Sequence, residues 1–255
     1  MNVKKIIRWL LPESFFEYRR RLLRKKMWNC NAGRSAGDVF AEIYSKNLWG
    51  GTAGELCSGT GSSGPVADAY CDMVNHFVKQ HGINSIVDIG CGDFKIGRKI
   101  ASGVQSYVGI DVVSDVVEFN STNYGCDNVQ FQCLDAAKDQ LPKAELCLVR
   151  QVFQHLSNQQ ILAITEKFKN YKYIMVTEHY PPMTQDFVAN KDKPHGADTR
   201  VCYGSAVVLD APPYNISTVE LVLSVPAVDC LLNNGELINT YLLSGSELME
   251  NSHTR

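Results

Sequence analysis

The sequence has no apolar run that approaches the ~20 residues needed to cross a bilayer as a helix. Its start is also a poor secretion signal, because Arg8 interrupts the first apolar stretch and no small-residue cleavage site follows. Nine cysteines are present, but their number is odd and no Cys-x-x-Cys pair occurs. Reduced thiols are therefore expected, with Cys133 and Cys147 as small buried hydrophobes inside apolar strand patterns. These absences favour a cytoplasmic protein.

Familiar metal-binding and phosphate-binding motifs are missing too. The chain has no H-E-x-x-H, no paired cysteine ligands and no D-x-[DN]-x-[DN]-G loop, so we expect no metal site. A metal site of the kind that activates catechols needs a cluster of acids near the fourth and fifth predicted strands, residues 144–149 and 173–177. Glu178 is the acid available there. A P-loop is excluded, because no G-K-[ST] follows a glycine-rich turn.

Neither sign of charge is in large excess, since the formal net charge is −2. The absence of a strong positive charge argues against nucleic acid as a partner. The N-terminus is an exception, because residues 1–26 hold nine Lys or Arg against two Glu. Residues 3–11 and 13–28 are predicted to be two helices, each with an apolar side and cations elsewhere. Such a pair fits peripheral contact of residues 1–28 with the anionic inner face of a membrane. It equally fits helices packed on the rest of the protein with a solvated basic face.

The chain is organised around residues 85–94, with the sequence SIVDIGCGDF. Its β-branched beginning predicts a strand buried in the middle of a parallel sheet, and a helical pattern follows from about Phe94 to Ile100. Gly90 and Gly92 make the turn between them, where a ligand can approach the backbone. The third glycine of a dinucleotide-binding fingerprint is replaced by Lys95. The motif left is Asp-x-Gly-x-Gly, beginning at Asp88.

Acids end the next two predicted strands. Residues 106–111 close with Asp111, which lies 23 residues after Asp88, and a carboxylate there can accept hydrogen bonds from ribose hydroxyls. Residues 129–134 precede Asp135. A fourth strand, 144–149, leads into Arg150 and Gln151. Each acid alone also fits a solvated strand end, but their regular spacing is hard to assign to chance.

These motifs resemble those of class I S-adenosylmethionine (SAM) dependent methyltransferases, which implies SAM as the cofactor. The resemblance implies a Rossmann-like α/β fold. Its seven-stranded sheet is mostly parallel with an antiparallel C-terminal hairpin, has helices on both faces and is preceded by N-terminal helices. The remaining strands are expected at 173–177, 218–225 and 237–243, and further helices at 66–81 and 156–168. The implied donor site comprises Asp88, Gly90, Cys91, Gly92, Asp111, Val112, Asp135, Ala136, Arg150 and Gln151.

A narrower resemblance rests on the NLWG motif at 47–50, the Ser-Gly-x-Gly-Ser run at 58–62 and the CGDF motif at 91–94. These look like motifs of a bacterial methyltransferase family whose members often belong to surface-polysaccharide or glycoconjugate pathways. The resemblance covers roughly residues 43–243 and implies a glycine-rich loop, 43–64, that folds over the donor site. We expect basic N-terminal helices at 1–42, a methyltransferase domain at 43–250, and an acceptor-side insertion at 179–215.

Methyl transfer from a sulfonium needs alignment, and it needs a general base only where the acceptor holds its proton tightly. His155 follows the fourth strand and is the first candidate base. The second is His179, one residue past the fifth strand, which closes with Glu178. Either imidazole also fits a purely structural role at the start of a helix or loop. Trp49, His195, Asp198 and Arg200 are candidates for binding a sugar or phosphate-bearing acceptor.

The segment Asp210-Ala211-Pro212-Pro213-Tyr214 looks like the [DN]-P-P-Y tetrad of enzymes that methylate amino groups of nucleic acids. That tetrad follows the fourth strand directly and needs a polar residue where this chain has Ala211. We therefore expect O-methylation of a sugar or related small acceptor in cell-envelope glycan synthesis. N-methylation of a protein or small amine, and a SAM-binding scaffold without catalysis, remain alternatives.

Overall fold

The computed structural model describes residues 30–31, 33–52, 55–217, 219–227, 235–246 and 248. The predicted N-terminal helices at 1–28 lie outside these residues. The chain divides into residues 1–34 and 35–255, and every element below belongs to the second part. The first of them, α3 (Ala36–Ser45), runs across the boundary expected between residues 42 and 43.

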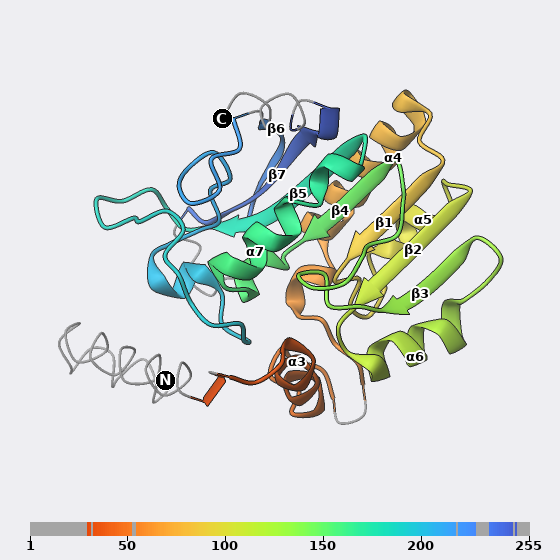
Figure 1. The fold of residues 1–255 in the computed structure, drawn as a ribbon, viewed down its shortest axis with the longest axis horizontal. Coiled ribbons are helices and arrows are strands. Elements are labelled where there is room, and N and C mark those ends of the chain that lie inside the picture. The colour runs from red at the N-terminus through yellow and green to blue at the C-terminus, as the bar shows by residue number, and fades with distance from the viewer. Residues whose placement is uncertain are drawn as a thin grey trace. The chain divides into compact units, whose positions relative to one another are not determined.

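A seven-stranded sheet in the order β3-β2-β1-β4-β5-β7-β6 forms the centre of this part (Figure 1). The first five strands in that order are parallel, whereas β7 is antiparallel to both β5 and β6. The predicted mostly parallel sheet with an antiparallel C-terminal pair is therefore confirmed. The strands are β1 (Ser85–Ile89), β2 (Ser106–Asp111), β3 (Val129–Cys133), β4 (Leu146–Arg150), β5 (Tyr173–Tyr180), β6 (Glu220–Pro226) and β7 (Leu237–Ser244).

Alternate residues of the central strands enter two separate cores, because successive side chains of a strand point to opposite faces. Val87 and Ile89 of β1 belong to one core, and Ile86 belongs to the other. The first core also receives α3, α6 (Ser114–Tyr124) and α7 (Asn158–Thr165). The second receives α4 (Pro65–His81) and α5 (Gly97–Ala101). Helices thus cover both faces, as predicted (Figure 1).

The strand order reverses between β1 and β4, since β2 and β3 lie on one side and β5 on the other. In open α/β sheets, ligands bind outside the carboxyl ends of the strands at such a reversal. The predicted glycine turn after β1 and the Arg150–Gln151 pair at the end of β4 both lie there.

Several boundaries differ from the predicted ones. The helix after the glycine turn begins at Gly97 rather than near Phe94, because Phe94 has a left-handed φ of +59° and its ring packs in the second core. The expected helix 156–168 ends at Thr165, and a separate 3₁₀ turn, Phe168–Asn170, follows. β5 continues past Thr177 to Tyr180, since β7 pairs with it along its full length. Cys147 is buried as expected, but Cys133 is exposed.

Residues 183–215 lack periodicity in the sequence, yet much of the segment is packed. It contains a 3₁₀ turn, Arg200–Tyr203, and it contributes Val207, Leu209 and Tyr214 to the first core. No helix among the described residues is long and apolar enough to cross a bilayer.

Candidate active site

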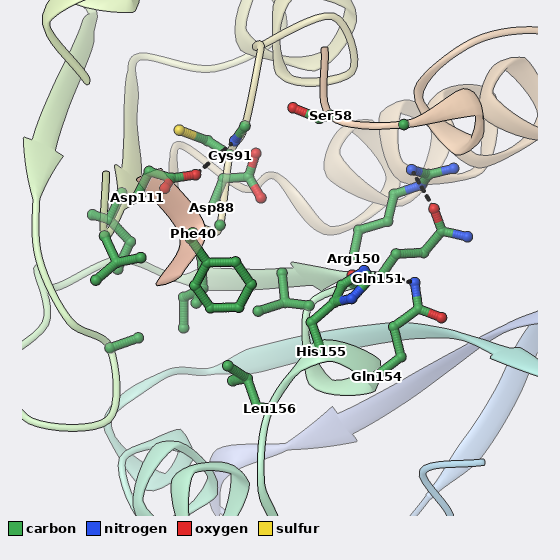
Figure 2. A pocket seen from close by; sticks show the side chains of 18 of the residues that line it. Phe40, Ser58, Asp88, Cys91, Asp111, Arg150, Gln151, Gln154, His155 and Leu156 are labelled. Carbon is green, nitrogen blue, oxygen red and sulfur yellow. Dashed lines mark hydrogen bonds between the residues drawn. The ribbon is translucent and has the colours of Figure 1, made fainter. Parts of the chain in front are cut away.

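A cavity of about 340 Å³ opens at the carboxyl ends of β1, β2 and β4 (Figure 2). Every residue predicted for the donor site lines this cavity. Three further predicted residues, Trp49, His155 and His179, also line it. The donor-site residues are Asp88, Gly90, Cys91, Gly92, Asp111, Val112, Asp135, Ala136, Arg150 and Gln151.

The glycine corner, Gly90–Gly92, is fixed by backbone hydrogen bonds to the neighbouring strand. The amides of Gly90 and Cys91 both donate to the carbonyl oxygen of Ile110, at 2.8 and 3.0 Å. Gly90 has a φ of +70°, and a Cβ built on it would lie 2.5 Å from a methyl carbon of Val152. The corner therefore requires glycine at this position for both its backbone conformation and its space.

Gly90→Ala is expected to lower the free energy of unfolding by roughly 2–4 kcal/mol, the sum of left-handed strain and overpacking. Gly82→Ala is the matched control, because Gly82 has a φ of +59° but nothing lies within 4 Å of its built Cβ. Chemical denaturation of the two variants measures the difference. Equal losses of stability would show that Val152 yields to the added methyl group.

Asp111 ends β2 inside the cavity, with an exposed fraction of 8%. Its two carboxylate oxygens accept hydrogen bonds from the amides of Gly92, at 3.2 Å, and Val113, at 3.1 Å. Burial raises the pKa of Asp111 to about 6, although these two amide donors oppose the change. Each oxygen keeps a second lone pair, so the carboxylate can accept from a pair of neighbouring hydroxyls.

The other two acids of the predicted site lie in the same cavity. Asp88 is buried beneath the glycine corner and accepts a hydrogen bond from the hydroxyl of Tyr107. Burial raises the pKa of Asp88 to about 6. Asp135 accepts from the amide of Ala137 at 3.0 Å and pairs with Lys138 at 3.0 Å. Apolar side chains complete this wall of the cavity: Val112, Leu134 and Ala136.

The segment 55–62 lies against the glycine corner. Ser58 and Asp93 exchange two hydrogen bonds: the Ser58 amide donates to the Asp93 carboxylate at 3.2 Å, and the Asp93 amide donates to the Ser58 hydroxyl at 2.7 Å. Arg150 donates from Nη2 to the carbonyl oxygen of Gly61 at 2.6 Å. These contacts attach the glycine-rich loop to the ends of β1 and β4.

The backbone is strained just after β4, at the cavity. Gln151 has a left-handed φ of +55°, although it is not glycine, and its amide donates to the carbonyl oxygen of Thr177 at 2.7 Å. Non-glycine residues in this region cost energy and cluster at binding and catalytic sites. Arg150, the preceding residue, lies over the ring of Tyr70, and its Nε is buried without a hydrogen-bond partner.

His155 belongs to a 3₁₀ turn, Phe153–His155, that is attached to β5. The buried carboxylate of Glu178 accepts from the amides of Phe153 and Gln154, at 2.8 and 3.1 Å. Burial raises the pKa of Glu178 to about 8. Glu178 therefore fixes the backbone of the turn, which places His155 on the cavity wall.

The imidazole of His155 is held in one tautomer. Its Nδ1 lies 3.1 Å from the carbonyl oxygen of Gly196, which can only accept, so Nδ1 carries the proton. Nε2 is then an acceptor. Burial, together with the positive charge of Lys193, lowers the pKa of His155 to about 3. The ring is therefore neutral across the physiological pH range, and its Nε2 faces the amide nitrogen of Gln154 at 3.4 Å.

His179 lines the cavity from within β5, not from a residue beyond the strand as predicted. Its Nε2 lies 2.9 Å from a carboxylate oxygen of Glu236. Burial lowers the pKa of His179, although Glu236 opposes the change.

Three predicted acceptor residues, His195, Asp198 and Arg200, do not line the cavity. Arg200 is 1% exposed and donates to the carbonyl oxygens of Lys191 and Leu156. Asp198 pairs with Lys193 at 3.4 Å and accepts from the hydroxyl of Tyr203. The ring of His195 lies 6.3 Å from that of Phe40. The charged groups of Asp198 and Arg200 therefore bind other groups of the protein, and these contacts hold together the segment that packs against His155.

Several cavity residues were not predicted. Phe40 and Tyr44 come from α3, which the sequence assigned in part to a separate N-terminal region. Gln154 lies between two predicted residues, Gln151 and His155. Its burial in the structure, and no motif in the sequence, identifies it as a cavity residue. No group of three or more His, Cys, Asp or Glu side chains in the described residues could hold a metal ion.

No known family profile matches the sequence, and no curated protein matches it. Solved structures share its fold. The N-methyltransferase NodS from Bradyrhizobium japonicum, in complex with S-adenosyl-l-homocysteine, is 13% identical over 69% of this chain and 86% of NodS, with a TM-score of 0.50. Human N-acetylserotonin methyltransferase, in complex with SAM, is 16% identical over 83% of this chain and 60% of the human chain, also with a TM-score of 0.50. The predicted Rossmann-like fold is therefore confirmed.

Proposed function

We propose that the chain is a SAM-dependent methyltransferase that transfers a methyl group to oxygen on a sugar or related small acceptor. The observation that carries the proposal is the gathering of Asp111, the glycine corner and Asp135 in one cavity at the reversal of strand order. Solved neighbours of the same fold were crystallised with SAM or its product, S-adenosylhomocysteine.

The residues predicted for the donor site fit the chemical groups of SAM. Asp111 offers two oxygens to a ribose diol, and the wall of Val112, Leu134 and Ala136 offers apolar contact to a purine ring. Asp135, at the rim of that wall, would accept from an exocyclic amino group. The guanidinium of Arg150, which lines the cavity, would hold the carboxylate of an amino-acid tail. When bound, SAM supplies a methyl group already activated by a positively charged sulfur.

The protein's part is then to orient the acceptor, exclude water and accept a proton. Trp49 and four residues of the segment 55–62 line the cavity, which supports the exclusion of water: Ser58, Gly59, Gly61 and Ser62. We assign His155 as the general base for an alcohol acceptor, because its neutral imidazole lines the cavity and its Nε2 makes only a long contact, 3.4 Å, with the amide nitrogen of Gln154, which an acceptor hydroxyl would displace. His179 is the weaker candidate, since Glu236 already occupies its Nε2.

The test is to measure SAM and S-adenosylhomocysteine binding by calorimetry and then to incubate the protein with radiolabelled SAM and fractionated cell-envelope precursors. Saturable binding and a labelled, base-stable product in a glycan fraction are the expected results. Binding without label in any fraction would support the scaffold alternative. Absence of binding would overturn the proposal.

We also propose that the basic N-terminal segment holds the protein at the inner face of a membrane, where a lipid-carried glycan acceptor would be found. This proposal rests on the sequence, because residues 1–28 lie outside the described part of the chain. Each cation near an anionic surface contributes roughly 1 kcal/mol. The full chain is expected to float with anionic liposomes and to be released by salt, whereas a chain that starts at Asn29 is not. Equal partitioning of the two proteins would exclude membrane contact through this segment.

A further inference from the structure

We propose that the loop of residues 193–198, closed by a buried ion pair between Lys193 and Asp198, positions both His155 and Trp49 in the cavity. The inference rests on the proposed function, in which His155 is the base. It makes Lys193 and Asp198 positioning residues for methyl transfer, although the sequence suggested acceptor binding for Asp198 and no role in the site for Lys193.

The 193–198 loop presents two consecutive carbonyl groups to two side chains of the cavity. The carbonyl oxygen of Gly196 lies 3.1 Å from Nδ1 of His155, and that of Ala197 accepts from Nε1 of Trp49 at 3.2 Å. Both side chains line the cavity, and the centroids of their rings are 5.0 Å apart. Two neighbouring peptide groups of one loop therefore set the orientation of both rings.

The contact between Gly196 and His155 is reciprocal. The amide of Gly196 donates to the carbonyl oxygen of His155 at 3.0 Å, while Nδ1 of His155 donates to the carbonyl oxygen of Gly196. The other ring nitrogen, Nε2, has a longer contact of 3.4 Å with the amide nitrogen of Gln154. The Gly196 carbonyl is therefore the closer partner and the stronger determinant of which nitrogen carries the proton.

An ion pair joins the two ends of this loop, which contains no helix or strand. Nζ of Lys193 lies 3.4 Å from a carboxylate oxygen of Asp198, and the two side chains are 1% and 19% exposed. Just beyond the loop, the guanidinium of Arg200 donates to the carbonyl oxygens of Lys191 and Leu156. The loop is thus closed by its own side chains and attached to the residue that follows His155.

The ion pair is suited to hold one arrangement of the loop. Burial lowers the pKa of Lys193 to about 8, an effect that Asp198 opposes, so the ammonium group is still charged at pH 7 and needs its partner. A buried ion pair adds little stability compared with apolar residues of similar size, and its best-attested use is to specify one geometry. After burial, the charge of Lys193 is the next largest influence that lowers the pKa of His155. Lys193 therefore lies close enough to His155 to act on it by charge as well as through the loop.

The experiment reads the two rings without turnover and without an acceptor. Nitrogen NMR of the full chain, labelled at histidine, distinguishes protonated from unprotonated ring nitrogens, and the signals of His155 are those lost in His155→Asn. For fluorescence, Trp9→Phe and Trp28→Phe leave Trp49 as the reporter, because the chain has three tryptophans. Lys193→Met, Asp198→Asn and the double variant are compared. Lys169→Met, at an exposed lysine of the 3₁₀ turn Phe168–Asn170, is the control.

We expect Nδ1 of His155 to be protonated and Nε2 unprotonated in the unaltered protein and in Lys169→Met. Each single variant of the ion pair should shift the His155 signals toward a mixture of the two tautomers and change the emission of Trp49. The double variant should change them no further than a single one, because the two residues act as one pair. Label transfer to the envelope fraction that accepts it should fall by about tenfold or more, since the base is no longer aligned. Binding of S-adenosylhomocysteine, measured by calorimetry, should be unchanged.

A folded Lys193→Met protein with unaltered His155 signals and unaltered Trp49 emission would overturn the inference, even if its thermal stability were lower. If Lys193→Met does not fold, Asp198→Asn decides in the same way, because Asp198 is partly exposed and asparagine keeps an acceptor for the hydroxyl of Tyr203. Failure of the unaltered protein to bind S-adenosylhomocysteine would instead overturn the proposed function, and it would leave the tautomer measurement standing.

Discussion

Replacing Asp111 with alanine is expected to weaken the binding of S-adenosylhomocysteine by about 100-fold, because two hydrogen bonds to an ionised group would be lost. The carboxylate is buried, faces the cavity and is already oriented by the amides of Gly92 and Val113. The ribose diol would find no other paired acceptor at the end of β2. Calorimetric titration of the variant measures the loss directly.

The same carboxylate predicts how donor binding depends on pH. Burial raises the pKa of Asp111 to about 6, and only the ionised form accepts from both hydroxyls. Affinity should therefore rise as the pH increases through about 6 and level off above it. Asp111→Asn keeps one acceptor oxygen but cannot ionise, so its weaker binding should change less with pH in this range, and the dependence that is left should come from Asp88, whose pKa burial also raises to about 6.

Asp115→Asn is the matched control, because Asp115 is an exposed acid at the start of α6. Its donor affinity should equal that of the unaltered protein. Thermal unfolding of Asp111→Ala checks that the glycine corner survives the loss of its carboxylate contact. Unchanged affinity in a folded Asp111→Ala protein would contradict the assignment of the donor site.

His155→Asn is expected to lower kcat for methyl transfer to an alcohol by about 100-fold or more, the usual range for loss of a general base. The binding of S-adenosylhomocysteine should be almost unaffected, since the donor contacts come from the strand ends. Because the pKa of His155 is lowered to about 3, its protonation should not limit activity between pH 5 and 9. Any loss of activity near pH 6 should follow donor binding through Asp111. Radiolabel transfer across this pH range, measured at saturating and at limiting donor, separates the two effects.

His179→Asn distinguishes the two candidate bases. His179 is paired with Glu236, so its replacement should reduce kcat far less than that of His155. A larger effect at His179 would reverse the assignment. Full activity in both variants would favour an amine acceptor, which needs no base when its nitrogen is unprotonated.

The donor side of the site could be predicted because its signals are local. Asp88, Asp111 and Asp135 each stand next to a short apolar strand pattern, and parallel strands bring their carboxyl ends to one edge of a sheet. Their placement in one cavity follows from that topology. Arg200 shows where this reasoning stops. An arginine in an irregular segment suggests a binding group, but the fold uses its guanidinium to hold the carbonyl oxygens of Lys191 and Leu156.

The sequence by itself determined the fold class, the glycine corner and the acids at the carboxyl ends of the strands, because each depends on neighbouring residues and on strand order. Only the tertiary structure decided which other side chains complete the cavity. Phe40, Gln154 and Ala197 come from three distant parts of the chain, so no spacing reveals that they meet. The tertiary structure also decided the charge of His155, because burial, and not residue type, sets whether an imidazole is neutral.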